Sequence, residues 1–170
     1  WPFDREVAAL FTGRRADDVF RTVDGPWSGG DPDAMFAEIV ALVPRDRLPD
    51  AVPGAVATIE RAAVAGIPLA LVTSASVRWA DKALAALGGL ARFDAVVTRD
   101  DVVAGKPDPS CYALACERLG VDAGAALACE DAPQGVVAAV GAGVGTVVGV
   151  TTSSSGRALT GGGASTTMGD

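Results

Sequence analysis

Polar residues suited to phosphate chemistry follow three short apolar runs of the chain. They are Thr73 and Ser74 after the first run, Lys106 in a Gly-Lys-Pro-Asp-Pro turn after the second, and the adjacent acids Glu130 and Asp131 after the third. Hydroxyl, ammonium and paired carboxylate groups together are suited to binding phosphate and a divalent cation. The chain contains no histidine, which excludes Ser-His-Asp catalysis, histidine-ligated zinc and imidazole acid–base chemistry.

The hydroxyl groups of Thr73 and Ser74 can donate hydrogen bonds to a phosphoryl oxygen. Free backbone N–H groups at the start of the following helix would assist them. Ordinary turn and capping preferences also favour hydroxyl residues at such positions, and capping is the better explanation for Ser76. For Thr73, phosphate binding and a turn role stay open as alternatives.

Lys106 lies in a turn whose prolines keep the backbone extended. Asp108 can cap the helix that is expected to begin at Pro109. A lysine held in this way can act as a point charge that keeps phosphate and a nucleophilic carboxylate together. The alternative is a solvated surface lysine.

Glu130 and Asp131 are adjacent carboxylates at the end of an expected buried strand. They repel each other and are poorly hydrated there unless a cation compensates, and Mg²⁺ prefers a few carboxylates with water and phosphate oxygens. Asp131 has a second explanation, because Asp-Ala-Pro-Gln forms a capping box in which Gln134 reaches back. Capping does not explain Glu130, so the pair predicts a metal site.

The elements that position these groups are predicted as helices first and alternating strands and helices afterwards. Apolar residues at helical spacing predict helices at 4–11, 14–22 and 31–43. Apolar runs predict strands at 68–73, 93–98, 125–130 and 145–150, with the first buried on both faces. This order indicates an α/β fold, a Rossmann-like parallel sheet with helices on both faces plus a small all-helical part. Ligands of such sheets bind at the carboxyl ends of the strands, where the three polar groups lie.

The overall composition indicates which partners and which compartment to expect. The chain has 170 residues with 21 acidic and 14 basic side chains, a net charge of −7, so we expect no nucleic-acid partner. Residues 132–156 carry no charge, but their Gly and Val content and the GAGVG break indicate a short helix and a strand, and no membrane association is expected. Three cysteines without a C-x-x-C pair favour a reducing compartment, and we expect a cytoplasmic protein that is a monomer or a weak dimer.

Three motifs carry a family resemblance. LALVTSAS, VVAGKPDP and ALACEDAPQGVVAAVGAG followed by VVGVTT closely resemble the second, third and fourth motifs of the haloacid dehalogenase superfamily, over about residues 50–152. The branch that the chain resembles contains β-phosphoglucomutases and sugar-phosphate and glycerol-phosphate phosphatases. The resemblance implies phosphoryl transfer through an aspartyl-phosphate. Its site residues would be Thr73 and Lys106 on the phosphate, Ser74 beside them, and Glu130 and Asp131 as Mg²⁺ ligands.

The resemblance also implies a domain organisation. It predicts a small helical cap at 1–48, a Rossmann-like phosphotransfer core lacking its first strand at 49–152, and an edge strand or flexible tail at 153–170. Within the cap, Arg14 and Arg15 are candidates for binding an anionic substrate on closure, because guanidinium groups suit phosphate and carboxylate. Solvated arginines at a helix start are the alternative.

The family's first motif, Asp-x-Asp-Gly followed by Thr or Val, supplies the nucleophile and does not occur in this sequence. FDRE at 3–6 lacks the second Asp at the required spacing. We therefore expect a truncated form of a longer enzyme, trimmed at both ends, and no turnover from the chain as given.

The function predicted for the full-length form is a Mg²⁺-dependent phosphatase acting on a small phosphorylated metabolite, a sugar phosphate or glycerol phosphate. A phosphoglucomutase with the same core is one alternative, and a non-catalytic phosphate-binding or partner-binding remnant is another. A receiver-type signalling module is disfavoured, because its acidic pair precedes the hydroxyl and lysine residues, whereas Glu130 and Asp131 come last here.

Overall fold

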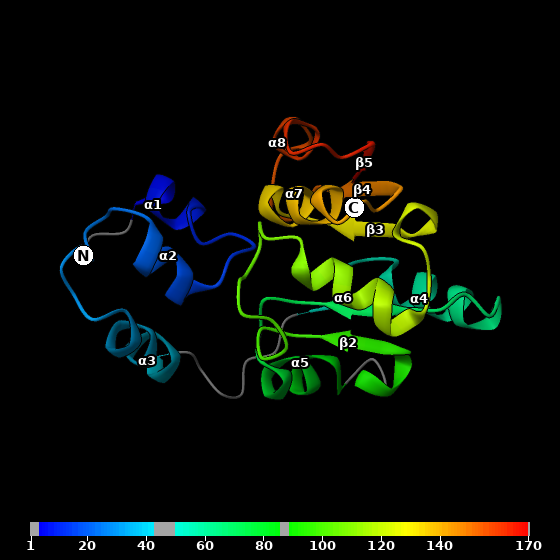
Figure 1. Cartoon of the computed structure of the whole chain (residues 1–170), viewed down its shortest axis with the longest axis horizontal. Helices are drawn as coiled ribbons and strands as arrows, with labels where there is room; N and C mark the ends of the chain where they lie inside the picture. The colour runs from blue at the N-terminus through cyan, green and yellow to red at the C-terminus, as the bar shows by residue number, and fades with distance from the viewer. Residues whose placement is uncertain (1–3, 43–49, 86–88, 170) are drawn as a thin grey trace.

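The computed structural model describes residues 4–42, 50–85 and 89–169. The first stretch is all helical, with α1 at Arg5–Ala9, α2 at Ala16–Thr22 and α3 at Pro32–Leu42. These three helices lie beside the rest of the molecule (Figure 1). We refer to residues 4–42 as the helical segment.

Aromatic residues hold the helical segment together. Val19, Phe20 and Trp27 are buried, and Val7, Leu10 and Met35 are among the residues that pack against them. The rings of Phe11, Phe20 and Trp27 meet edge to face, with centroids 5.2 to 5.6 Å apart. Each such pair contributes about 0.5 to 1.5 kcal/mol beyond the area it buries. The helical segment therefore has a small core of its own.

The rest of the described chain alternates helices and strands, which confirms the predicted α/β class. Every strand pair is parallel. The elements are α4 (Ala55–Val64), β1 (Ala70–Val72), α5 (Val77–Leu84), η2 (Leu90–Arg92), β2 (Ala95–Val97), α6 (Ser110–Leu119), η3 (Ala123–Ala125), β3 (Leu127–Glu130), α7 (Pro133–Gly141), β4 (Thr146–Val150), α8 (Gly156–Gly161) and β5 (Thr166–Met168).

The strands form two parallel sheets where the sequence predicts one. One sheet has the order β1-β2 and the other the order β3-β4-β5. Within the described residues, no strand pairs with the second edge of β1 or of β3. The prediction that 68–73 is buried on both faces is wrong, because all three residues of β1 are half-buried. A strand with a single neighbour has less cover than a central strand.

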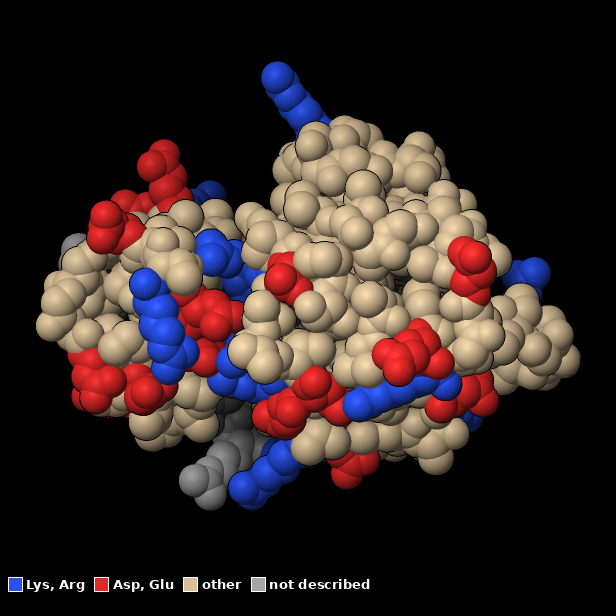
Figure 2. All heavy atoms as spheres, in the orientation of Figure 1, with Lys and Arg blue, Asp and Glu red and all other residues tan. Residues whose placement is uncertain are grey.

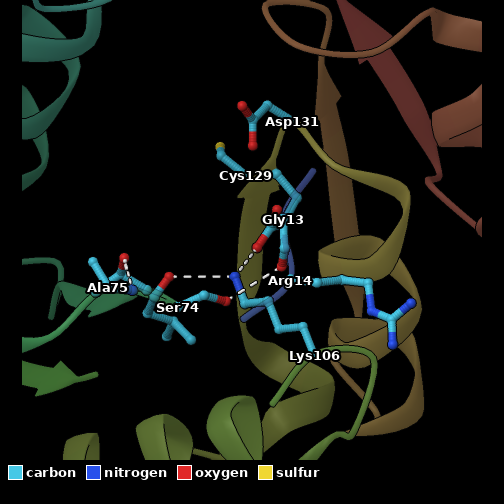
Figure 3. A pocket seen from close by; sticks show the side chains of 10 residues that line it. Gly13, Arg14, Ser74, Ala75, Lys106, Cys129 and Asp131 are labelled. Carbon is cyan, nitrogen blue, oxygen red and sulfur yellow. Dashed lines mark hydrogen bonds and ion pairs between the residues drawn. The ribbon is translucent and has the colours of Figure 1, made fainter. Parts of the chain in front are cut away.

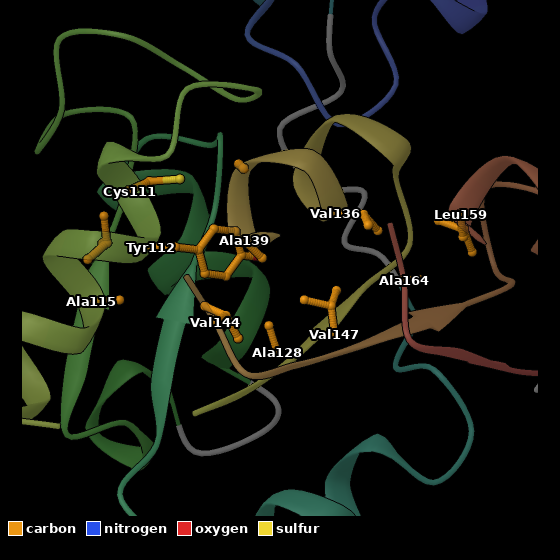
Figure 4. Close-up of a cluster of buried hydrophobic side chains, with 12 residues drawn as sticks. Cys111, Tyr112, Ala115, Ala128, Val136, Ala139, Val144, Val147, Leu159 and Ala164 are labelled. Carbon is orange, nitrogen blue, oxygen red and sulfur yellow. The ribbon is translucent and has the colours of Figure 1, made fainter. Parts of the chain in front are cut away.

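The main core packs small and branched side chains between α6, α7 and the strands (Figure 4). Val97 of β2, Val136 of α7 and Val147 of β4 are 1% exposed or less. Beyond Val150 the chain continues into α8 and β5, and Leu159 of α8 is fully buried in the same core.

The uncharged stretch 132–156 forms α7 and β4, as its glycine break indicates. Among the described helices, none is long and apolar enough to cross a membrane. Figure 2 shows acidic and basic side chains close together where the helical segment meets the rest of the molecule. The fold therefore brings charged groups to that boundary, next to the strand ends.

Candidate active site

A pocket of about 440 Å³ opens at the carboxyl ends of β1 and β3, next to the turn between α1 and α2. It is lined by Gly13, Arg14, Val72, Thr73, Ser74, Ala75, Lys106, Cys129, Glu130 and Asp131 (Figure 3). All three predicted polar groups border this one pocket, although they are spread over more than 50 residues of the chain, from Thr73 to Asp131. Ligand sites of parallel sheets form at the carboxyl ends of the strands, which explains why these three groups lie together.

Lys106 and Glu130 form a buried ion pair at the base of the pocket. Their side chains are 7% and 6% exposed, and Nζ of Lys106 bonds to Oε1 of Glu130. The same Nζ lies 3.4 Å from the carbonyl oxygen of Val72 at the end of β1. The ammonium group therefore sits between the ends of β1 and β3, where it borders the cavity.

Tyr112 contacts both members of this ion pair. Its hydroxyl group donates a 2.5 Å hydrogen bond to Oε1 of Glu130, and Nζ of Lys106 lies 5.2 Å from the centre of its ring. Burial, followed by the negative charge of Glu130, raises the pKa of Tyr112, so the phenol stays protonated and acts as a donor. Gly135 of α7 leaves room for the carboxylate, since a Cβ atom there would lie 2.1 Å from Oε2 of Glu130.

The hydroxyl groups of Thr73 and Ser74, which follow β1, make different hydrogen bonds. Oγ1 of Thr73 accepts the N–H of Ala75 at 3.1 Å, and Oγ of Ser74 donates to the carbonyl oxygen of Gly13 at 3.2 Å. Ser76 caps α5 by accepting the N–H of Trp79, as predicted. Thr73 thus combines the expected turn role with a position at the pocket wall, where its hydroxyl proton can be donated to a ligand. Ser74 links the pocket to the helical segment.

Asp131 is not explained by helix capping. The N-cap residue of α7 is Ala132, which makes no side-chain capping bond, so the capping-box explanation for Asp131 and Gln134 is wrong. The carboxylate of Asp131 instead accepts hydrogen bonds from Ser153 at 2.5 Å and Thr152 at 3.5 Å. It lines the pocket beside Glu130 and stays a predicted metal ligand with it.

The donor set fits a magnesium ion that keeps most of its water. The described residues contain no group of three or more His, Cys, Asp or Glu placed to hold a metal, so Glu130 and Asp131 would supply at most two carboxylates. Mg²⁺ is commonly bound by one or two carboxylates with water and substrate phosphate oxygens. Because Oε1 of Glu130 is already bonded to Lys106 and Tyr112, Asp131 is the more available ligand.

Arg14 and Arg15, the two candidate arginines of the helical segment, lie in different surroundings. Arg14 lines the pocket, but its Nη2 donates to Oγ1 of Thr22 at 3.1 Å, and its side chain runs away from Ser74 and Asp131 (Figure 3). Arg15 does not line this pocket; its guanidinium group bonds to the backbone of Val102 and Val103. The structure therefore brings Arg14 to the pocket wall and places Arg15 in a contact with another loop.

The thiol that borders the pocket is not an activated nucleophile. Partial desolvation of the exposed Cys129, followed by the charge of Glu130, raises the pKa of its thiol, which favours the protonated form at neutral pH. The charged side chains that line the pocket are two cations, Arg14 and Lys106, and two carboxylates, Glu130 and Asp131.

Comparison with known proteins defines the class to which this fold and pocket belong. Residues 5–143 match the family of haloacid dehalogenase-like hydrolases, and the chain belongs to that family. This confirms the resemblance drawn from the three motifs and excludes the receiver-type alternative.

The curated relatives of the chain include phosphatases, and a similar solved structure contains bound phosphate. The chain is 38% identical over 160 residues to validoxylamine A 7'-phosphate phosphatase of Streptomyces hygroscopicus subsp. limoneus, covering 93% of this chain and 75% of that protein. It is 34% identical over 139 residues to hexitol phosphatase A of Escherichia coli, covering 81% of this chain and 64% of that protein. A crystal structure of CbbY from Rhodobacter sphaeroides in complex with phosphate superposes with a TM-score of 0.72 at 27% identity, over 99% of this chain and 79% of that one. The family and its phosphatases support the predicted phosphomonoester hydrolase.

Proposed function

We propose that this chain forms the phosphate- and substrate-binding part of a magnesium-dependent phosphatase that acts on a sugar phosphate or a similar polyol phosphate. The observation that carries the proposal is the buried ammonium group of Lys106, which borders a pocket that Thr73 and Asp131 also line. A fixed positive charge beside hydroxyl and carboxylate groups is the arrangement that phosphoryl transfer needs, because that reaction depends mainly on placement and charge neutralisation.

Each pocket residue has a distinct role in this proposal. Thr73 donates a hydrogen bond from its hydroxyl group to a phosphoryl oxygen, and Lys106 neutralises the charge of the phosphate. Glu130 holds Lys106 in position, and Asp131, with a contribution from Glu130, binds Mg²⁺. The bound ion would supply further positive charge to the phosphoryl oxygens.

The helical segment, residues 4–42, is the described part of the proposed cap at 1–48, and 49–152 is the proposed core; residues 1–3 and 43–49 lie outside the described structure. The support for the cap is that the carbonyl oxygen of Gly13 accepts the hydroxyl of Ser74 and that Arg14 forms part of the pocket wall. A cap that covers the pocket excludes water and contacts the non-phosphate part of the substrate. The phosphatase names of the relatives, one acting on validoxylamine A 7'-phosphate and one called a hexitol phosphatase, support a sugar-like substrate.

The 170 residues contain no Asp-x-Asp-Gly sequence, which is the motif that supplies the family's nucleophile. We therefore propose that this chain binds phosphate without turning over phosphate esters. In a form that carries the motif, release of phosphate without an isomeric product would distinguish the phosphatase from the mutase.

The direct test is binding of inorganic phosphate in the presence of Mg²⁺, measured by isothermal titration calorimetry on the 170-residue chain. We expect saturable binding, weakened about 10- to 100-fold in Lys106→Met, since a hydrogen bond to a charged group is worth about 1.5 to 3 kcal/mol. Lys82→Met is the matched control, because Lys82 is an exposed residue of α5 outside the pocket. It should bind phosphate like the parent chain.

Lys106→Met leaves Glu130 buried without its cation, so a second variant separates binding from folding. Lys106→Met combined with Glu130→Gln removes both charges and should recover stability without recovering phosphate affinity. Undiminished phosphate binding in either variant, or no binding by the parent chain, would overturn the proposal.

A further inference from the structure

A second cluster of charged side chains joins the helical segment to the loop between β2 and α6. Its centre is Asp17 of α2, which is 4% exposed. Oδ2 of Asp17 lies 3.2 Å from Nη2 of Arg15, 3.1 Å from Nη1 of Arg21 and 3.0 Å from Nη2 of Arg99. We call these four residues the Asp17 cluster. Since a buried carboxylate needs cationic partners, the cluster ties α2 to the end of β2, where Arg99 lies.

Arg15 extends the cluster to the loop that carries Lys106. Its Nη1 donates to the carbonyl oxygens of Val102 and Val103 at 3.2 and 3.1 Å. Val103 is 98% exposed, so this part of the loop gains little from apolar packing. A planar guanidinium group can bond to a carboxylate and to two carbonyl oxygens at once, which an ammonium group cannot do in the same geometry.

Two glycines allow the helical segment to approach this closely. A Cβ atom on Gly105 would lie 2.5 Å from Oδ2 of Asp18 and 2.6 Å from Cδ of Arg15. A Cβ atom on Gly13, whose φ is +72°, would lie 2.3 Å from Cβ of Ala132. Gly105 directly precedes Lys106, and Ala132 directly follows Asp131. The close contacts therefore lie next to Lys106 and Asp131, the charged residues to which the proposed function assigns phosphate and Mg²⁺ binding.

We propose that Arg15, held by Asp17, is a positioning residue that fixes the loop at 98–106 so that Lys106 meets Glu130. Arg15 does not bind the substrate in this arrangement, because its side chain is 13% exposed and both of its Nη groups are bonded. The sequence made it a candidate for anion binding, and its contacts assign it to the loop. The functional meaning of the inference rests on the proposed role of Lys106 in phosphate binding.

The test compares Asp17→Asn with Asp33→Asn in the 170-residue chain. Asp33 is the matched control, because it pairs with Arg21 from an exposed position on α3. Amide hydrogen exchange should become about tenfold faster at 98–106 and 13–22 in Asp17→Asn, which corresponds to local opening made easier by about 1.4 kcal/mol. The Lys106 side-chain NMR signal should shift, and inorganic phosphate should bind several-fold more weakly. Asp33→Asn should change neither the exchange at 98–106 nor the Lys106 signal, because Arg21 keeps its bond to Asp17.

Gly105→Ala provides a second route that leaves every charge in place. Its methyl group should push Arg15 and Asp18 from the loop and reproduce the exchange pattern and the Lys106 shift, even if Asp17→Asn fails to fold. Unchanged exchange at 98–106 in Gly105→Ala, or an unshifted Lys106 signal in a variant that exchanges faster, would overturn the positioning role. Absence of phosphate binding by the parent chain would count against the proposed function alone, because hydrogen exchange and the Lys106 signal do not depend on it.

Discussion

Two charge clusters, each centred on a buried carboxylate, lie close to the pocket, and their cations have different partners. Lys106 shares one carboxylate with a neutral phenol, and its ammonium group borders the 440 Å³ cavity. The Asp17 cluster gathers three guanidinium groups on one carboxylate oxygen, and its cations bond to protein atoms across an interface. A surplus of positive charge therefore does not by itself define an anion site. The decisive property is whether the cation borders a cavity that a ligand can enter.

The largest loss of stability should come from breaking the buried ion pair between Lys106 and Glu130. Glu130→Gln leaves Lys106 without its counter-charge, and loss of one partner of a buried ion pair costs about 3 to 5 kcal/mol in the free energy of unfolding. Urea unfolding measures this loss. The control is Glu60→Gln, whose ion pair with Arg92 spans 3.7 Å on the surface and should contribute less than about 1 kcal/mol. Equal losses in the two variants would contradict the burial argument.

Asp17→Asn should cost less, about 1 to 3 kcal/mol at pH 7, since its partner guanidinium groups reach solvent more readily than Lys106 does. The cost should depend on pH. Burial acts to raise the pKa of Asp17, but the hydrogen bond from Arg15 and the charges of Arg99 and Arg15 outweigh it, so the pKa is lowered.

A lowered carboxyl pKa stabilises the folded state above the pKa of the unfolded chain. That stability is lost as pH falls through the lower, folded value. The difference in unfolding free energy between the parent chain and Asp17→Asn should therefore be constant above about pH 5 and shrink toward pH 2. Urea midpoints across this range measure it, and a difference that grew on acidification would contradict the sign.

The smallest effect on stability should come from Asp131→Asn, because its carboxylate is only half-buried and bonded to the hydroxyl groups of Thr152 and Ser153. We expect a change below about 0.5 kcal/mol in unfolding free energy. Phosphate affinity should nevertheless lose its dependence on Mg²⁺, measured by titration with and without EDTA. If stability falls and the Mg²⁺ dependence persists, Asp131 has a structural role.

The sequence was sufficient to predict which polar groups meet and the class of fold that brings them together. Periodicity places Thr73, Lys106 and Glu130 near strand ends, and parallel strands bring such ends to one edge. Tyr112 was missed because its contact depends on how α6 faces β3, which spacing along one helix does not give. The single tyrosine of the chain, in the first turn of the helix that follows the Lys-Pro sequence, is the signal that could have suggested it.

Other features depend on distances that no local pattern encodes. The role of Arg15 follows from the approach of α2 to a loop almost 90 residues later in the sequence. The apolar content of 68–73 predicts a strand but says nothing about how many neighbours it has, so the partial burial of β1 was not foreseen. The capping pattern at Asp131 is present in the sequence, but α7 begins without using that side chain.

The arrangement of the strands in two sheets has a consequence for handling the protein. Two sheets have four outer strands where one continuous sheet would have two, and the free sides of β1 and β3 add backbone donors and acceptors without a strand partner in the described structure. Leu127 of β3 is also 63% exposed. Sheet edges with unpaired backbone groups can pair with strands of other molecules. Concentrated solutions of this chain should accordingly self-associate by intermolecular β-pairing.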